Sequence, residues 1–420
     1  MAKERSYLCI DLKSYYASVE CVERGLDPLT AKLVVADPER TEKTICLAVS
    51  PALKAQGVRN RCRVFEIPEG IDYIMAKPRM ALYMQVAARI YGIYLRYVSE
   101  EDIHVYSIDE VFMDITDYYE ARGLTAKSFA SEILHEIYAR TGLTATCGLG
   151  SNLYLAKIAL DISSKRAPDH VGVLTEESYR RELWHHKPIT DFWRIGPGTA
   201  RRLARLGIDD MGGVAGANED ALYKIFGIDA ELLIDHAWGR EPTTMADIKS
   251  FHPQSRSLTR GQILIRDYDY ATARIVVREM AEDLALELFE QGLEARTVGL
   301  SLGYTYRAER APARGSVAME LPCSSVRMLA DAAQELYDRI MAREDTIRRI
   351  NLCYGGVRER GSLQYGMFTG AEELRREERL QRAMVSIRKK YGKNGLLKAM
   401  DLQEGATAME RNRQIGGHRA

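Results

Sequence analysis

Three carboxylates in two short stretches are the residues of this sequence best suited to carry out a reaction. Asp109 and Glu110 are adjacent within residues 104–114, and Asp11 directly follows the apolar residues 7–10. Adjacent carboxylates repel each other unless a positive charge lies between them. Mg²⁺ meets that need, because it binds a few carboxylate oxygens and leaves coordination positions for substrate phosphates. Three acids from two strands are the minimum for a site with two metal ions about 3.5–4 Å apart, which holds the attacking and leaving oxygens of a phosphoryl transfer.

The elements around these acids are two short stretches of sheet. The longer one predicts strand, tight turn and strand, since apolar and β-branched residues flank Ser107-x-Asp109-Glu110. Successive side chains of a strand point to opposite faces, so Asp109 and Glu110 can converge only if the backbone bends there. The apolar run before Asp11 predicts a strand that leads into a helix, with Ser14 as a candidate cap. On its own, the adjacent pair would be better explained as two solvated acids at a hairpin tip, and Asp11 is what favours a metal site.

Length, charge and cysteine content limit the class of protein. A chain of 420 residues suggests two to four domains. Lys and Arg together number 59, as do Asp and Glu, so nucleic-acid binding would require local basic surfaces. The seven cysteines are scattered without a C-x-x-C pair, which favours a reducing cytoplasm over structural zinc or disulfides. The chain shows no signal sequence and no apolar run long enough to span a membrane.

The N-terminal part predicts a catalytic α/β domain with a small insertion. Strand, helix, hairpin, helix, strand and helix follow one another in residues 1–30 and 75–165, which is the order of a ferredoxin-like palm. Residues 31–74 contain only short strands, turns and a small helix, and we expect a lid or insertion there. Gly148-x-Gly150 is interpreted as a tight turn from strand to helix, because a lone G-x-G is weak support for a dinucleotide loop.

The middle of the chain is predominantly helical. Residues 195–208 contain Gly196 and Gly198 ahead of a helix that ends in Leu-Gly-Ile, which is typical of a helix-hairpin-helix. The glycines of that motif let backbone N–H groups approach a DNA phosphate. An ordinary packing corner between two helices is the alternative. Residues 243–254 are polar with Pro253 near their end, and we interpret them as a linker.

The C-terminal part predicts a second α/β domain and a tail. Arginines, among them Arg256 and Arg260, lie in or beside the expected strands, while acids concentrate in the helices. This pattern predicts a basic sheet face that follows a phosphate backbone. A solvated mixture of charges would give the same sequence pattern and is the alternative. The tail predicts a helix at 371–391, with Leu380, Met384 and Tyr391 in its apolar stripe, and a flexible end at 401–420. The expected strands are 257–265, 296–306, 314–321 and 347–357, and the expected helices are 270–291 and 324–343.

With these motifs in order, the chain resembles a Y-family, translesion DNA polymerase, and is most similar to the UmuC-like bacterial branch. The resemblance covers roughly residues 1–360 and includes Asp11, the run 15–20, Ser107-x-Asp109-Glu110, residues 148–157 and the hairpin at 195–208. It implies an α/β and α+β multidomain fold. The implied parts are a palm (1–30 and 75–165), fingers (31–74), a helical thumb with the helix-hairpin-helix (166–242), a linker (243–254), an α+β little finger (255–358) and a tail (359–420).

The resemblance also implies the roles of individual residues. Asp11, Asp109 and Glu110 would be the catalytic carboxylates that bind two Mg²⁺ ions, with the Leu12 carbonyl as a further ligand. Tyr16 falls at the steric gate, which rejects a ribose 2′-OH, and Tyr15 lies beside it; core packing is the alternative for both. Lys54 and Lys165 would contact the dNTP triphosphate, the latter with a register uncertain by about one residue.

The fingers depart from the family pattern. In many members a Tyr-x-x-Arg grips the phosphates, whereas this chain has Pro51 and Lys54 there. Lys54 supplies charge but not the bidentate fork of an arginine. The departure concerns how the triphosphate is held and leaves the predicted reaction class unchanged.

The predicted function is error-prone translesion synthesis in the SOS response to DNA damage. The expected partners are primer-template DNA, dNTPs and a sliding clamp. The clamp is expected because the peptide Gln364-x-x-Met367-Phe368 resembles a clamp-binding peptide. We expect a monomer that does not bind membranes and acts in the bacterial cytoplasm at the nucleoid. Two alternatives stay open: another palm enzyme such as a nucleotide cyclase, and a non-catalytic DNA- and clamp-binding protein derived from a polymerase.

Overall fold

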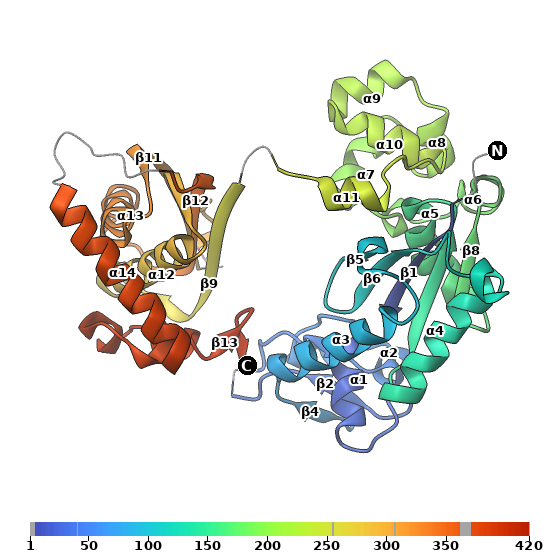
Figure 1. The fold of residues 1–420 in the computed structure, drawn as a ribbon, viewed down its shortest axis with the longest axis horizontal. Helices are drawn as coiled ribbons and strands as arrows, with labels where there is room; N and C mark the ends of the chain where they lie inside the picture. Colours follow the sequence, from blue (N-terminus) through green and yellow to red (C-terminus); the bar gives the residue numbers. More distant parts are fainter. Residues whose placement is uncertain (1–4, 40, 254–255, 306–307, 362–370, 420) are drawn as a thin grey trace. The chain divides into compact units, whose positions relative to one another are not determined.

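The chain divides into two compact units, Met1–Phe251 and His252–Ala420 (Figure 1). The computed structural model describes residues 5–39, 41–253, 256–305, 308–361 and 371–419. The boundary between the units falls inside the segment 243–254 that the sequence predicts as a linker. Among the described residues, no helix is both long and apolar enough to cross a membrane.

A five-stranded sheet forms the centre of the first unit, in the order β5-β6-β1-β7-β8. β1 is antiparallel to both β6 and β7, whereas β8 is parallel to β7. β1 is buried on both faces, because the alternating residues Leu8 and Ile10 on one face and Tyr7 and Cys9 on the other are all inaccessible. The strands are β1 (Tyr7–Leu12), β5 (Ile103–Val105), β6 (Glu110–Asp114), β7 (Ala145–Gly150) and β8 (Val171–Leu174).

Helices cover this sheet in the predicted order. The helices are α1 (Tyr15–Val22), α3 (Met80–Tyr94), α4 (Ala126–Thr141) and α5 (Leu153–Ile158). α5 begins after its N-cap Asn152, whose side chain accepts a hydrogen bond from the Leu155 N–H. The strand β8 was not predicted, and it continues the sheet beyond residue 165, where the predicted palm ends.

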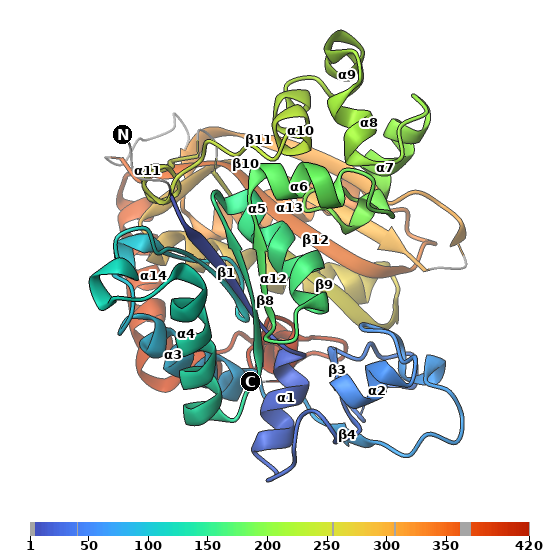
Figure 2. The same ribbon diagram turned by 90° about the vertical axis from the view of Figure 1, so that its right-hand side faces the viewer.

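The sequence Gly148-x-Gly150 lies inside β7 and is not a turn, which corrects our interpretation of it. A Cβ atom added to Gly148 would lie 2.0 Å from the carbonyl oxygen of Ala156, and one added to Gly150 would lie 2.3 Å from the Ala156 nitrogen. The two glycines therefore let the backbone of α5 rest directly on the strand (Figure 2). This close approach brings the side chains of α5 next to β1 and β6.

Residues 31–76 form the small insertion that the sequence predicts. A three-stranded sheet in the order β3-β2-β4 packs with the short helix α2 (Pro51–Ala55). Its core holds only a few side chains, including Val34, Val49 and Leu53. The strands are β2 (Leu33–Val35), β3 (Ala48–Val49) and β4 (Ile74–Ala76).

Short helices follow the central sheet and share a core of their own. They are α6 (Glu176–Leu183), α7 (Pro197–Ala204), α8 (Met211–Ala215), α9 (Glu219–Phe226) and α10 (Asp229–Ala237). The predicted linker is wrong over much of its length, because Met245–Ser250 form helix α11. Met245 is buried in a cluster with Cys9 and Phe112, and Lys249 Nζ donates to the Glu100 carbonyl at 3.0 Å. Helix α11 therefore belongs to the first unit.

The second unit is a four-stranded antiparallel sheet in the order β11-β10-β12-β9, with two long helices packed on one face (Figure 1). All four predicted strands and both predicted helices are present. The strands are β9 (Arg256–Tyr268), β10 (Leu293–Tyr304), β11 (Ala313–Cys323) and β12 (Ile347–Glu359), and the helices are α12 (Tyr270–Glu290) and α13 (Val326–Ile340).

Arg260, one of the arginines that the sequence predicts on a basic sheet face, does not lie on the open face of this sheet. Arg260 points to the helix-covered face, where its guanidinium pairs with Asp283 and Glu287 of α12. Because side chains alternate along each strand, the neighbours of the buried core positions face away from the helices. Many of these outward residues are small and uncharged: Thr259, Gly261, Thr297, Gly299, Ser301, Asn351, Cys353 and Gly355. The exposed Arg314 and Arg349 lie on the same face, because they pair with the outward residues Ser301 and Gly303.

The C-terminal residues are folded onto the second unit, which corrects the prediction of a flexible end. Helix α14 (Ala371–Tyr391) is present as predicted, but Leu380 and Tyr391 of its expected stripe are exposed, and Met384 and Val385 contact the core. Beyond it lie helix α15 (Ala408–Arg411) and the hairpin of β13 (Gln414–Ile415) with β14 (His418–Arg419).

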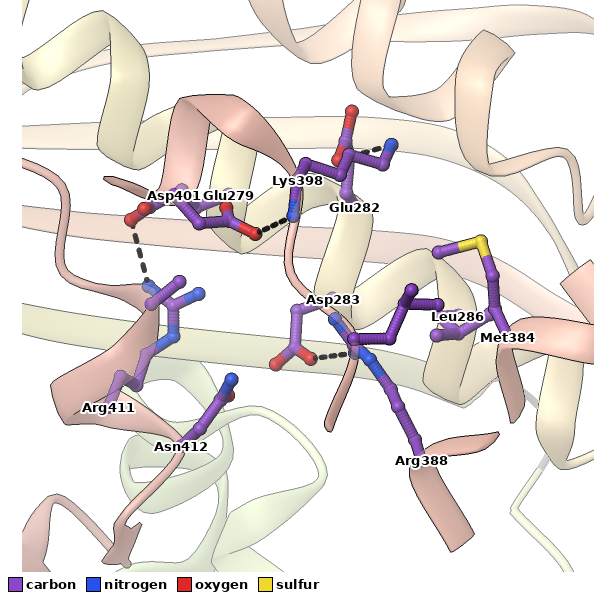
Figure 3. A pocket seen from close by; sticks show the side chains of 12 residues that line it. Glu279, Glu282, Asp283, Leu286, Met384, Arg388, Lys398, Asp401, Arg411 and Asn412 are labelled. Atoms are coloured by element: carbon purple, nitrogen blue, oxygen red, sulfur yellow. Dashed lines mark hydrogen bonds and ion pairs between the residues drawn. The ribbon is translucent and has the colours of Figure 1, made fainter. Parts of the chain in front are cut away.

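Charged side chains hold this C-terminal segment against α12 (Figure 3). The Arg411 guanidinium lies 3.6 Å from Glu279, whose side chain is inaccessible to solvent, and Arg388 donates to Asp283 at 2.9 Å. Lys398 completes the set by pairing with Glu282 at 2.6 Å. The predicted clamp-binding residues Gln364, Met367 and Phe368 lie outside the described residues.

Candidate active site

The hairpin β5–β6 brings the three predicted carboxylates to one place in the first unit. Asp11 on β1 pairs directly with Glu110 on β6, so their side chains lie on the same face of the sheet. Asp109 precedes β6 in the hairpin turn, and its carbonyl accepts a hydrogen bond from the Leu12 N–H at 3.0 Å. The backbone therefore bends between Asp109 and Glu110, which is the condition for the two acids to approach Asp11.

The electrostatics of Asp11 show that the three acids interact. Burial, followed by repulsion from the carboxylates of Asp109 and Glu110, raises the pKa of Asp11 to about 7. A divalent cation between the three groups would remove this repulsion. Oxygen ligands of this kind are also the ones that Mg²⁺ prefers, so the donor set fits such an ion.

Each of the other two acids has its own partner in the structure. Asp109 accepts a hydrogen bond from the Ser107 hydroxyl at 2.6 Å, and Glu110 accepts one from Cys9 Sγ at 3.3 Å. In the part of the chain that the structure describes, no group of three or more His, Cys, Asp or Glu side chains is arranged to hold a metal ion. These hydrogen bonds orient the Asp109 and Glu110 side chains in the metal-free protein.

A buried lysine that sequence reasoning missed lies against this group of acids. Lys157 on α5 places its ammonium 2.8 Å from Glu110 and 3.0 Å from Asp161. Burial would lower the pKa of Lys157, but the charges of these carboxylates outweigh it and hold the pKa above its ordinary value. The sequence did contain a signal, because Lys157 is the one charged residue in the apolar run 153–160.

The two adjacent tyrosines after Asp11 have different environments. Tyr15 is buried, and its hydroxyl donates to the Tyr83 carbonyl at 2.6 Å, so it belongs to the core. Tyr16 is partly exposed and stacks on the ring of Tyr83, with 4.5 Å between ring centroids. Burial raises the pKa of Tyr16, and the negative charge of Asp109 raises it further, so this ring lies within electrostatic reach of the acids.

The two predicted phosphate-binding lysines lie in different places. Lys54 of α2 donates to the Ser14 hydroxyl at 2.8 Å, which brings the small insertion to the turn after Asp11. Ser14 itself adopts φ 49° and makes no side-chain hydrogen bond to the helix, so it is not the cap we expected. Lys165 is exposed in a short 3₁₀ turn, Ser164–Arg166, at the end of the helical segment that follows β7.

The glycines of the predicted helix-hairpin-helix are exposed at the start of α7. Gly196 occupies the N-cap position with extended backbone, and Gly198 lies in the first turn. A Cβ atom added to either glycine would meet no atom within 4 Å. Internal packing therefore does not require glycine at either position. Of the predicted arginine contacts, Arg256 is exposed on β9, whereas Arg260 faces the helices.

Family comparisons match both units of the chain. Residues 10–161 match the impB/mucB/samB family, and residues 255–367 match the C-terminal domain of the same family. A protein of Bacillus subtilis strain 168, assigned provisionally to UV-damage repair and called UvrX, is 31% identical over 99% of this chain and 98% of its own length. "DNA polymerase IV 2" of the same organism is 28% identical over the full length of both chains.

A solved structure shares the fold. A chimera of the Y-family DNA polymerases Dbh and Dpo4 superposes with a TM-score of 0.67 and 20% sequence identity, covering 84% of this chain and 99% of the chimera. This likeness confirms the predicted fold class, in which a mixed α/β catalytic unit is followed by a helical part and a C-terminal α+β unit.

Proposed function

Because this chain belongs to the impB/mucB/samB family of Y-family DNA polymerases, we propose that it is a DNA-directed polymerase that extends primers across damaged template DNA with low fidelity. The observation that carries the proposal is the group of Asp11, Asp109 and Glu110 at the β1–β6 pair. Three mutually repelling acids beside a helix N-terminus are suited to nucleotidyl transfer, in which the primer 3′-oxygen bonds to the α-phosphorus of a dNTP and pyrophosphate leaves.

The residues at this site have different roles. Asp11, Asp109, Glu110 and the Leu12 carbonyl would hold two Mg²⁺ ions, whose charge stabilises the transferring phosphate group. Lys157 neutralises Glu110 while no cation is bound and keeps its side chain at the sheet. Because catalysis here consists mainly of positioning and charge stabilisation, the pairing of β1 with β6 sets the geometry of the reaction.

The incoming nucleotide is bound between the first helix and the insertion. The ring of Tyr16 packs under the deoxyribose and excludes a 2′-OH. Lys54 supports the triphosphate from α2, where it lies near Asp11 and Ser14, and Lys165 adds charge from its exposed turn. The small core of the insertion constrains the new base pair weakly, which favours tolerance of damaged templates.

Primer-template DNA is held by backbone groups and by the exposed arginines on the open face of the second sheet, Arg314 and Arg349. Gly196 and Gly198 leave the N–H groups at the start of α7 open to a phosphate. The open face of the β9–β12 sheet presents small residues, which let a DNA backbone approach the strands closely, and Arg256 adds charge at its edge. The enzyme acts as a monomer in the bacterial cytoplasm at the nucleoid, and Gln364, Met367 and Phe368 bind a sliding clamp.

Primer extension tests the proposal. Wild type and the variants Asp109→Ala and Glu110→Ala are given a primed template and Mg²⁺, with DNA binding followed by fluorescence anisotropy. We expect both variants to lose extension but keep DNA binding. Glu101→Ala is a matched control, because this acid is exposed just before the same hairpin, and we expect it to retain activity.

Three further results would contradict parts of the proposal. Extension by the Asp109→Ala variant would mean that the catalytic site lies elsewhere. Good extension on intact DNA with failure at an abasic template position would remove the translesion part. Binding without any extension by the wild type, even with a clamp added, would favour a non-catalytic DNA-binding protein.

A further inference from the structure

The ring of Tyr16 rests on a second tyrosine, Tyr83 of α3, which is itself fully buried. The two rings are stacked, with 4.5 Å between centroids and 19° between planes. Tyr15, the neighbour of Tyr16 in sequence, contacts it at a less parallel angle of 46°. Tyr83 therefore supports one face of the Tyr16 ring.

Tyr83 is held at both of its ends. Its hydroxyl donates to Glu20 Oε1 at 2.8 Å, and its carbonyl accepts the hydrogen bond from the Tyr15 hydroxyl at 2.6 Å. Glu20 and Tyr15 both lie on α1, the helix that carries Tyr16. Tyr83 of α3 thus contacts Tyr16 on α1 and is hydrogen-bonded to two other residues of α1. These contacts fix the spacing of the two helices at the Tyr16 ring.

Glu20 is a buried carboxylate with a full set of donors. Arg79 binds it in a bidentate manner, with Nε at 2.9 Å and Nη2 at 2.8 Å, and Arg24 pairs with it from the turn just after α1. A buried charge with this many partners keeps its position, because moving it would leave donors and acceptor unpaired. The hydroxyl of Tyr83 is therefore bound to a fixed point.

We infer that Tyr83, anchored by Glu20, positions the Tyr16 ring and thereby sets the discrimination against ribonucleotides. The inference rests on the proposed function, in which Tyr16 is the steric gate. A gate ring rejects a 2′-OH only if it cannot move away by a few tenths of an ångström, and such rigidity comes from the residues behind it. Tyr83 is a positioning residue, since it supports the ring and does not touch the nucleotide.

The experiment compares the incorporation of a dNTP and of the matching rNTP. The ratio of kcat/KM for the two nucleotides is measured for wild type, Tyr16→Ala, Tyr83→Leu, Tyr83→Phe and Glu20→Gln. We expect Tyr16→Ala to admit ribonucleotides most strongly and Tyr83→Leu to raise their relative use about tenfold. Tyr83→Phe keeps the stacked ring but loses its hydrogen bond to Glu20. Glu20→Gln keeps the ring and an acceptor but loses the charge by which Arg79 fixes that acceptor, and we expect rises of about threefold for both variants.

A control separates positioning from general loosening of the fold. Ile90 is buried on the same helix two turns beyond Tyr83, so Ile90→Ala weakens the packing of α3 without removing the stacked ring. We expect it to lower both kcat/KM values together and to leave their ratio unchanged. A change in the ratio for Ile90→Ala as large as that for Tyr83→Leu would overturn the inference.

The outcomes distinguish failure of the inference from failure of the proposed function. If Tyr16→Ala does not raise ribonucleotide use, Tyr16 is not the gate and the proposed nucleotide site is misplaced. If Tyr16→Ala raises it but the Tyr83 and Glu20 variants do not, the gate stands and the positioning role is wrong. Should Tyr83→Leu fail to fold, Tyr83→Phe and Glu20→Gln decide the question, and unchanged ratios in both would refute it.

Discussion

The ammonium of Lys157 lies 2.8 Å from Oε1 of Glu110, and both side chains are only 10% exposed. The pair joins α5 to β6 across the face of the sheet that carries Asp11. It exists because Gly148 and Gly150 allow α5 to rest on β7. A packing feature of the sheet therefore determines which charge faces Glu110 in the metal-free protein.

Removal of the Lys157 ammonium should destabilise the metal-free protein. The variant Lys157→Met leaves Glu110 buried without its partner, and we expect the free energy of unfolding to fall by about 3 kcal/mol in urea titrations. Mg²⁺ should restore part of this loss by neutralising the same acid. Lys127→Met is the control, because Lys127 and Asp169 form an exposed pair at 2.7 Å, and we expect a loss below about 1 kcal/mol. Equal losses in the two variants would contradict the prediction.

The effect of Mg²⁺ on thermal stability should depend on pH. The pKa of Asp11 is raised to about 7 in the folded protein, whereas that of an unfolded Asp is about 3.9. Stability from the protonated Asp11 is thus present below pH 4 and is lost as the pH rises through 7. Above pH 7 the ionised Asp11 is repelled by its neighbours, and a cation relieves this repulsion without displacing a proton.

Thermal shifts with added Mg²⁺ measure this dependence. We expect the Mg²⁺ concentration for half of the maximal shift to be about tenfold higher at pH 6 than at pH 8, because one pH unit below a pKa leaves about a tenth of the group ionised. In Asp11→Asn the dependence on pH should largely disappear. An unchanged dependence in that variant would assign the titration to another group.

A methyl group at Gly148 should disrupt the palm sheet. Because an added Cβ would lie 2.0 Å from the Ala156 carbonyl oxygen, α5 would have to move away from β7. We expect Gly148→Ala to lose about 3 kcal/mol of stability and most of its activity. Gly92→Ala is the matched control, since Gly92 lies in α3 with no atom within 4 Å of an added Cβ, and its stability should stay the same or rise slightly.

A methyl group at Gly198 should weaken DNA binding without affecting the fold. The site has open space around it, so Gly198→Ala should keep the melting temperature of the wild type. A side chain there would stand between a phosphate and the N–H groups at the start of α7, and we expect a loss of about 1 kcal/mol in affinity for primer-template DNA. Wild-type affinity in a gel-shift or anisotropy titration would favour the packing-corner interpretation.

The buried pair of Arg411 and Glu279 should hold the C-terminal segment in place. Burial raises the pKa of Glu279, and Arg411 offsets that cost as long as α15 stays docked (Figure 3). Arg411→Met should therefore cost about 3 kcal/mol, and Glu279→Gln in the same chain should recover part of it. Lys389→Met removes an exposed pair with Glu290 and serves as the control. Additive effects of the Arg411 and Glu279 changes would argue against direct coupling.

The sequence alone determined the local elements and the stretches that carry the site. Strand β1, the hairpin around Asp109 and Glu110, and all six elements from β9 to β12 were predicted, because each depends on the spacing of apolar residues and on turn residues within one short segment. The same local reasoning selected Asp11, Asp109 and Glu110 as the acids of the predicted site, and placed Gly196 at the start of a helix.

Only the tertiary structure decided what these residues contact. The side of the sheet that Arg260 occupies depends on where α12 packs, and a strand by itself does not reveal which of its faces is covered. The polar C-terminal segment is ordered because Arg411 finds a buried acid 132 positions earlier, at Glu279. Lys157 with Glu110 and Tyr83 with Tyr16 are likewise distant in sequence. Such pairs form because folding brings distant segments together, and the local sequence pattern of one segment contains no information about the other. The resulting burial sets the charge state and rigidity of the site.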